Sequence, residues 1–181
     1  IGQVVSASSA QVYGLAKAPP VYAPLDEDHP HRPVNCYALS KVAGEEAADY
    51  FVANRGMTIL SFRFMGVRTP DQIGPEIDRM VEDPAGGAWL LWTRTDARDA
   101  AMACRLAVEA EEVASGPYNI TGPRVVLEDA PLDLVERHFG TEVEVRGDLA
   151  GSASPLSCER AETGFGYRPA YAWSVSQRHP E

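Results

Sequence analysis

Lysine is nearly absent from this chain of 181 residues, and clusters of basic residues are absent altogether. Only Lys17 and Lys41 are lysines, the other fourteen basic residues are arginines, and twenty-six acidic residues bring the net charge to −10. Nucleic acids and anionic membrane surfaces attract clustered basic side chains. We therefore expect neither a nucleic acid nor a membrane as a partner.

The excess of carboxylates over lysines has two explanations. A strongly acidic surface keeps a protein soluble in concentrated salt, as in a halophile. A GC-rich genome that favours arginine codons would leave the same composition. The sequence leaves both open.

Cysteine is also scarce. Cys36, Cys104 and Cys158 are odd in number, widely spaced and without a Cys-x-x-Cys pair, which favours a reduced, cytoplasmic chain. No apolar run reaches the ~20 residues of a membrane span, and no signal-peptide pattern opens the chain. Because the first residue is Ile1 and not Met, we expect that part of the protein precedes the numbered chain.

The first third of the chain reads as strand, helix and strand. A β-branched run over residues 2–9 predicts a buried strand that ends in small hydroxyl residues. A polar connection over 14–35 with five prolines follows, and a loop of this length is typical of a lid or binding loop. A helix from Asn35 or Tyr37 to about Asn54, closed by Gly56, and a second buried strand over 57–66 complete a βαβ unit of a parallel sheet.

The remaining chain alternates short helices and strands. Hydrophobic periodicity predicts a short helix over 71–83, a short strand over 89–93, a helix over 98–112, a strand over 117–121, a helix over 131–139, a strand over 142–146 and a short helix over 158–163. A turn over 164–169 follows. The fold class is therefore α/β.

Tyr37 and Lys41 are four residues apart on the first predicted helix, so their side chains share one face. An ammonium beside a phenol favours the phenolate, which a tyrosine needs in order to act as a base near neutrality. Such pairs are frequent on ordinary amphipathic helices. Here the pair opens the helix of a βαβ unit, and Ser8 and Ser9 end the preceding strand, where ligands of open α/β sheets bind.

The residues around this pair resemble a known family. Residues 8–14, Ser-Ser-Ala-Gln-Val-Tyr-Gly, and residues 33–41, Pro-Val-Asn-Cys-Tyr-Ala-Leu-Ser-Lys, are similar to motifs of the extended short-chain dehydrogenase/reductases, the NAD-dependent epimerase/dehydratase family. Residues 96–101 resemble the family's acidic motif before a helix, and 164–169 its C-terminal Gly-Tyr-x-Pro turn. These four segments stand in the family's order.

The resemblance implies an enzyme that uses NAD or NADP. Tyr37 would be the catalytic acid/base and would also contact the cofactor, and Lys41 would bind the nicotinamide ribose and promote the phenolate. Ser9 would bind the substrate and orient its reacting oxygen, with Ser8 as the weaker alternative. Residues Phe64 to Val67 would pass beside the nicotinamide. The family commonly dimerises through the helix that carries the Tyr-Lys pair, so a homodimer is expected.

The sequence also departs from the family. No Gly-rich phosphate-binding turn opens the chain, so we expect a partial Rossmann-like parallel sheet, its last βαβ units, with a small C-terminal α/β substrate-binding region. Residues 1–68 would be the catalytic part, and 69–181 a mixture of substrate-binding region and remaining Rossmann elements. The alternative is a truncated remnant that keeps the fold as an interaction module without the cofactor.

Two further departures bear on the substrate. In sequences that resemble sugar-nucleotide 4,6-dehydratases, the end of this strand reads Thr-Asp-Glu, whereas here it reads Ser9-Ala10-Gln11. Many sugar-nucleotide enzymes carry Asn shortly after the arginine of the next strand, whereas here Gly66 stands at that place. Dehydration is therefore disfavoured and a nucleotide-linked sugar is in doubt. A simpler sugar-like alcohol or its ketone remains as the expected small-molecule substrate.

Several other residues receive weaker interpretations. Arg98 is a candidate substrate-binding residue, and Asp99 is expected to cap its helix. His29 and His31 are expected to be solvated in an exposed loop, with no metal bound. Trp89 and Trp92 could line a pocket, although core packing is the stronger expectation, and Cys36 is expected to be a buried spectator.

Overall fold

A three-stranded parallel sheet forms the centre of the structure, a computed structural model that describes residues 2–147 and 149–178. Its strand order is β1 (Gln3–Ser9), β3 (Thr58–Phe64) and β6 (Gly116–Ile120). Ser9 pairs with Phe64, and Phe64 with Ile120. The carboxyl ends of the three strands therefore meet at one edge of the sheet.

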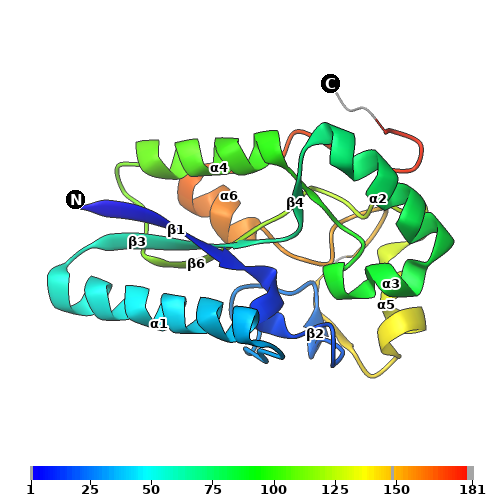
Figure 1. Cartoon of the computed structure of the whole chain (residues 1–181), viewed down its shortest axis with the longest axis horizontal. Helices are drawn as coiled ribbons and strands as arrows, with labels where there is room; N and C mark the ends of the chain where they lie inside the picture. Colours follow the sequence, from blue (N-terminus) through cyan, green and yellow to red (C-terminus); the bar gives the residue numbers. More distant parts are fainter. Residues whose placement is uncertain (1, 148, 179–181) are drawn as a thin grey trace.

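Helices cover both faces of this sheet. α1 (Cys36–Arg55) lies along one face, and α4 (Ala97–Glu109) and α6 (Glu159–Phe165) lie on the other (Figure 1). Rossmann-like sheets have this layering, because parallel strands need helical crossovers that cover both faces. The predicted α/β class and partial parallel sheet are confirmed.

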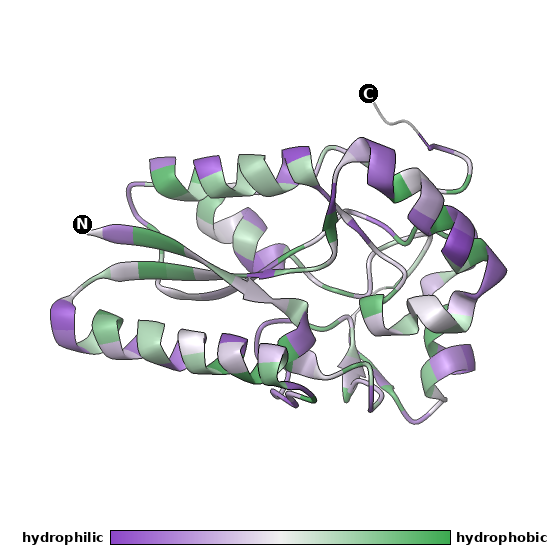
Figure 2. Ribbon diagram, viewed as in Figure 1, coloured by the Kyte–Doolittle hydropathy of each residue, from purple (hydrophilic) through white to green (hydrophobic). Residues whose placement is uncertain are grey.

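Local chemistry sets the ends of α1. The side chain of Asn35 accepts a hydrogen bond of 2.8 Å from the Ala38 amide, as an N-cap does. Gly56 ends the helix in the left-handed region at φ 60°, where glycine is favoured. Hydrophobic and hydrophilic residues both occur along the whole length of α1 (Figure 2), and only Ala38 and Glu45 are buried.

The remaining elements form a second region beyond the carboxyl edge of the sheet. Two small parallel pairs lie there, β2 (Tyr22–Ala23) with β7 (Glu144–Val145) and β4 (Val67–Arg68) with β5 (Thr95–Asp96). The helical segments are η1 (Ala10–Tyr13), α2 (Pro70–Glu82), α3 (Pro84–Gly87), η2 (Ala88–Leu90) and α5 (Pro131–Phe139). The division of the chain at residue 68 stays a prediction.

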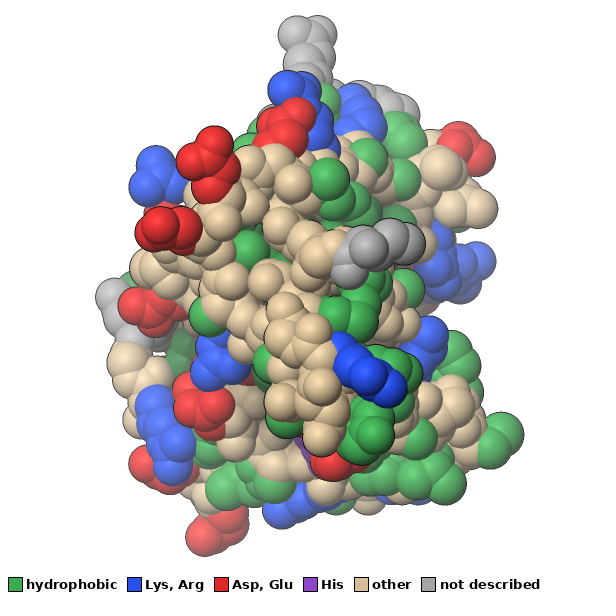
Figure 3. All heavy atoms as spheres, turned by 90° about the vertical axis from the view of Figure 1, so that its left-hand side faces the viewer, with side chains coloured by type: hydrophobic (Ala, Val, Ile, Leu, Met, Phe, Trp, Pro, Cys, Tyr) green, Lys and Arg blue, Asp and Glu red, His purple; other side chains and the backbone are tan. Residues whose placement is uncertain are grey.

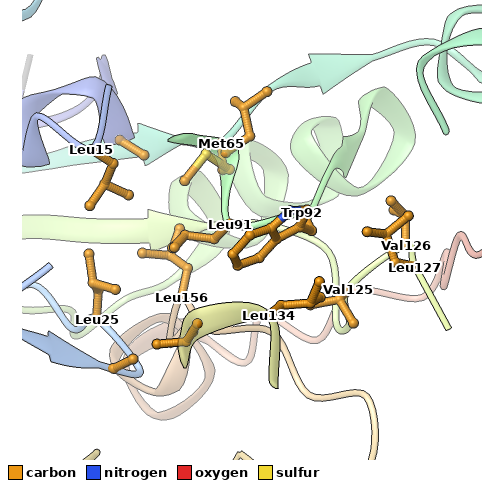
Figure 4. Close-up of a cluster of buried hydrophobic side chains, with 14 of the residues drawn as sticks. Leu15, Leu25, Met65, Leu91, Trp92, Val125, Val126, Leu127, Leu134 and Leu156 are labelled. Carbon is orange, nitrogen blue, oxygen red and sulfur yellow. The ribbon is translucent and has the colours of Figure 1, made fainter. Parts of the chain in front are cut away.

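Two hydrophobic clusters hold the regions together. One surrounds Trp92 and draws side chains from loops and helices of both halves of the sequence (Figure 4). The other lies between the sheet and α4 and α6, where the Phe62 and Phe165 rings stack at 5.5 Å. Burial of apolar side chains is the main stabilising contribution to each cluster.

The long connection over 14–35 is pinned to the body of the protein. Arg32 donates a backbone hydrogen bond of 2.8 Å to Val12, and Leu25 donates one of 2.8 Å to Pro155. Gly14 has φ 72°, and a Cβ there would lie 2.0 Å from the Arg32 carbonyl oxygen, so only glycine permits this approach. The connection is therefore anchored to the body at several points, and its role as a lid or binding loop stays a prediction.

One predicted strand is wrong. Residues 89–93 form η2 and a turn, with Leu91 and Trp92 at φ 51° and 52°, a conformation that a strand cannot contain. Trp92 is fully buried and confirms core packing, whereas Trp89 is 39% exposed. The other predicted elements are present within a few residues, except that α4 ends at Glu109, three residues before the predicted end.

Two burial expectations are also wrong. Cys36 is exposed, because it stands at the first turn of a helix that buries little. His29 is buried against the rings of Tyr13 and Tyr22, and its Nε2 accepts a hydrogen bond of 2.9 Å from the Val21 amide. Its burial lowers the pKa of His29, so the imidazole is neutral at pH 7.

Candidate functional site

A hollow of about 360 Å³ opens at the carboxyl ends of β1 and β3. This is where ligands bind in open α/β sheets, and the volume lies at the small end of the range of ~300–1,000 Å³ for ligand pockets. Its lining includes Ser8, Ser9, Tyr37, Lys41, Phe64 and Val67, together with Gly66, Trp89 and Leu90. The structure therefore brings together all but one of the site residues that the sequence singled out.

Tyr37 and Lys41 stand on the first two turns of α1. Tyr37 is 46% exposed, and the Lys41 Nζ atom lies 5.4 Å from the centre of its ring. Nζ also donates a hydrogen bond of 2.8 Å to the Ala7 carbonyl oxygen of β1. The ammonium is thus held beside the phenol by the strand that delivers the serines.

The two serines have different surroundings. Ser8 Oγ donates a hydrogen bond to the carboxylate of Glu45. Ser9 Oγ accepts one of 3.2 Å from the Gln11 amide and caps η1, so its own proton remains to be donated to a ligand. Of the two, Ser9 is therefore the better placed to orient a reacting oxygen.

Another part of the hollow's wall is formed where β3 ends. Phe64 is the last residue of β3, and Gly66 turns the chain at φ 55° toward β4. A Cβ at Gly66 would lie 3.3 Å from Arg94 Cδ, which leaves little room for a larger residue. Phe64 and Val67 present apolar surface to the hollow, as a stacked aromatic ring would need.

Arg98 does not line this hollow. Its Nε and Nη2 atoms donate hydrogen bonds of 3.0 and 2.9 Å to Asp96, and its guanidinium lies 3.4 Å over the Tyr171 ring. The neighbouring Asp99 accepts bonds from the amides of Ala170 and Tyr171. This acidic motif joins the start of α4 to the C-terminal segment, and substrate binding by Arg98 stays a prediction.

A second hollow of about 430 Å³ adjoins the first. The two share Arg68, Trp89 and Leu90 as lining residues. Within the second, Arg68 and Arg94 both donate hydrogen bonds to Glu76.

A buried polar network behind the hollow was not singled out from the sequence. Arg63, 2% exposed, donates to Glu45 through Nε and Nη2 at 3.0 and 2.7 Å, and through Nη1 to the Tyr13 hydroxyl at 3.0 Å. Burial opposes the charge of Arg63, but its bonds to Glu45 and Tyr13 outweigh burial and raise its pKa. An arginine within the apolar run 57–66 was the available signal.

His31 belongs to the same network. Its Nε2 atom accepts a hydrogen bond of 2.6 Å from Arg63 Nη2, and partial burial and the Arg63 charge lower the pKa of His31. Across residues 2–147 and 149–178, no group of three or more His, Cys, Asp or Glu side chains could hold a metal ion.

One comparison with known proteins shows the family. The profile of the "NAD dependent epimerase/dehydratase family" matches residues 1–121, which is more than half of the chain. A search of curated protein sequences finds no match.

Among the helices of the described part of the chain, none is long and apolar enough to cross a membrane.

Three solved structures illustrate the likeness of the fold. A short-chain dehydrogenase/reductase superfamily protein from Agrobacterium tumefaciens with bound NAD is 21% identical, with a TM-score of 0.63 over 98% of this chain and 65% of its own. A UDP-galactose 4-epimerase is 21% identical, with a TM-score of 0.56 over 95% of this chain and 59% of its own. A UDP-glucuronic acid 4-epimerase from Bacillus cereus in complex with NAD is 17% identical, with a TM-score of 0.61 over 95% and 57%.

The chain therefore spans about three fifths of the length of these structures. The sequence motifs, the parallel sheet and the profile match lead to one conclusion: the chain belongs to the NAD-dependent epimerase/dehydratase family.

Proposed function

We propose that this chain carries the catalytic residues of an NAD(P)-dependent oxidoreductase or epimerase that acts on a sugar-like alcohol or its ketone. The observation that carries the proposal is the meeting of Ser9, Tyr37 and Lys41 in one hollow at the carboxyl end of β1. The family assignment supports the use of a nicotinamide cofactor. The sugar-like substrate is supported by the two epimerases of similar fold.

Each side chain has a role in this chemistry. Tyr37 takes the proton of a substrate hydroxyl during oxidation and returns it during reduction, a contribution of about 10²- to 10⁴-fold in rate. Lys41 stabilises the phenolate through its positive charge. Ser9 donates a hydrogen bond to the reacting oxygen and holds it near Tyr37.

The residues present fit the nicotinamide end of the cofactor. Lys41 offers an ammonium for the ribose hydroxyls, and Phe64 and Val67 offer apolar surface for the ring. When bound, the nicotinamide supplies the hydride acceptor or donor. The sequence holds no Gly-rich turn for the pyrophosphate, so that half of the cofactor would need residues outside the numbered chain.

The test of this function is the substitution Tyr37→Phe, made in the chain together with any upstream segment that its gene encodes. With a panel of aldoses, uronic acids and their keto forms, turnover followed by NADH absorbance is expected to fall by at least about 10²-fold. Affinity for NAD should change less than about threefold, because phenylalanine keeps the ring of Tyr37 beside the cofactor and removes only the hydroxyl that transfers the proton. Tyr50→Phe, on the exposed side of the same helix, is the matched control and should keep full activity.

Retained turnover in Tyr37→Phe would overturn the role of Tyr37.

The alternative, a cofactor-free remnant or interaction module, makes a separate prediction. Calorimetric titration of the same protein with NAD and NADP should then give no binding heat. A binding isotherm with either cofactor rejects the remnant.

We further propose that the protein is a homodimer that pairs through α1. Leu39, Tyr50 and Phe51 on this helix are exposed, although helices of soluble proteins usually turn such residues inward. Seen from the end of the sheet, apolar side chains gather along the lower edge of the molecule, where α1 lies (Figure 3).

A further inference from the structure

Glu45 connects the helix of the Tyr-Lys pair to two strands of the sheet. Its carboxylate accepts hydrogen bonds from Ser8 on β1 and from Arg63 on β3. Ser8 and Arg63 are partners in the strand register, so both present their side chains to the face that α1 covers. Glu45 is 7% exposed, and a buried carboxylate with this set of donors has one favourable position.

The same face of α1 carries the proposed catalytic side chains. Tyr37, Lys41 and Glu45 follow one another at intervals of four residues, so they lie along one side of the helix within about 80° of rotation. Lys41 contacts Ala7, and Glu45 contacts the next residue of β1, Ser8. Two successive residues of the strand thus meet two successive turns of the helix.

We propose that Glu45 is a positioning residue that, through Ser8 and Arg63, sets the rotation and height of α1 against the sheet so that Lys41 and Tyr37 meet Ser9. The catalytic importance of this role rests on the proposed function, whereas the contacts of Glu45 are independent of that function. A shift of α1 by about 1 Å would misplace the acid/base relative to the serine, and errors of that size cost roughly 10²-fold in rate.

Stability alone is a weak reason for a buried ion pair at this position. Replacing a buried ion pair by apolar residues of similar volume is often neutral or stabilising, because both charges lose their hydration. The pair does specify geometry, since the planar guanidinium engages the carboxylate through two nitrogen atoms. Removal of the Glu45 charge leaves Arg63 buried without its anionic partner.

The scarcity of lysine gives a direct readout. When the chain is labelled with ¹³Cε-lysine, only Lys17 and Lys41 give signals, and Lys17→Arg assigns them. Lys17 is exposed, so its signal marks a freely moving side chain. Lys41, held by the Ala7 carbonyl oxygen, should give a separate signal in the unmodified chain, and this measurement requires neither cofactor nor turnover.

In Glu45→Gln the Lys41 signal is expected to move at least halfway toward that of Lys17, because α1 loses its fixed position against β1. Ser8→Ala, which removes one hydrogen bond and keeps the ion pair, should cause a smaller movement in the same direction. Glu46→Gln is the matched control, because it removes the same charge from the neighbouring residue, whose side chain is exposed. It should leave the Lys41 signal unchanged.

A folded Glu45→Gln protein, judged by circular dichroism, whose Lys41 signal coincides with that of the unmodified chain overturns the proposal. Should Glu45→Gln not fold, Ser8→Ala decides by the same criterion. Where turnover is established, Glu45→Gln should lower kcat about tenfold or more with little change in KM. Failure of the proposed function would remove this last effect and leave the lysine signals as predicted.

Discussion

Glu76 is a nearly buried carboxylate held between two arginines at the second hollow. It accepts a hydrogen bond of 2.7 Å from Arg68 Nε and another from the buried Arg94. Burial alone would raise the pKa of Glu76, but the bonds from Arg94 and Arg68 outweigh it and lower the pKa. A carboxylate with a lowered pKa in the folded state stabilises the fold above its unfolded pKa, about 4.3, and loses this contribution as the pH falls through its folded pKa.

We therefore predict that Glu76→Gln lowers the free energy of unfolding by about 1–3 kcal/mol near pH 7, because Arg94 loses a charged acceptor. The difference from the unmodified chain should shrink as the pH falls below about 4. Urea denaturation across this range measures it. Burial raises the pKa of Glu27 and of Asp99, so their contributions to the free energy of unfolding have the opposite pH dependence. Both residues are present in Glu76→Gln and in the unmodified chain, and their contributions therefore cancel in the difference between the two proteins.

Glu82→Gln, an exposed position on the same helix, is the control and should change stability by less than about 0.5 kcal/mol. A difference between Glu76→Gln and the unmodified chain that stays constant down to the lowest pH would contradict the predicted ionisation of Glu76.

At the level of single residues, the sequence predicted what depends on local spacing. Tyr37, Lys41 and Ser9 could be placed together because the position of one helix and the end of one strand determine where these three residues lie. The burial of His29 and the exposure of Cys36 could not, because they depend on which distant rings and helix faces pack nearby. Glu45 was missed for the same reason, since its partners Ser8 and Arg63 belong to two other elements.

At the level of elements, helices with clear caps or proline starts were predicted well. α5 begins at Pro131 and ends before Gly140 as the sequence indicates. The apolar residues of 89–93 suggested a strand, yet they form a turn that drives Trp92 into the core against Phe139. Short apolar runs carry no periodicity that separates a strand from such a turn.

The exposed apolar side of α1 carries a prediction of its own. In the double variant Leu39→Glu with Phe51→Glu, the homodimer should dissociate into monomers, because a carboxylate at the centre of an apolar interface loses its hydration. Light scattering after size-exclusion chromatography measures the mass directly. Val108→Glu, on α4 at a position that is 66% exposed, is the matched control and should leave the dimer intact.

A monomeric mass for the unmodified chain over a wide range of concentrations would refute pairing through α1. So would a double variant that remains dimeric and folded. In either case the apolar side of α1 would need another partner.

At the level of the whole molecule, charge is the dominant property. The net charge is −10, and on the face shown in Figure 3 acidic and basic side chains are scattered and form no single basic patch. Repulsion between the carboxylates opposes the compact state at low ionic strength. Added salt reduces the Debye length from about 10 Å at 0.1 M to about 3 Å at 1 M, which removes most of the repulsion between exposed groups.

A protein adapted to salt should therefore gain stability steeply as potassium chloride rises from about 0.1 M to molar concentrations, with a higher melting temperature by circular dichroism. The exposed neighbours Glu111 and Glu112 provide a variant that separates charge repulsion from general salt effects on apolar surface. Glu111→Gln with Glu112→Gln should raise the melting temperature in low salt and leave it unchanged in molar salt. The opposite result would be a melting temperature that hardly depends on salt and does not rise in the double variant. It would support a GC-rich genome as the origin of the arginine excess, because codon bias replaces lysine by arginine without making stability depend on salt.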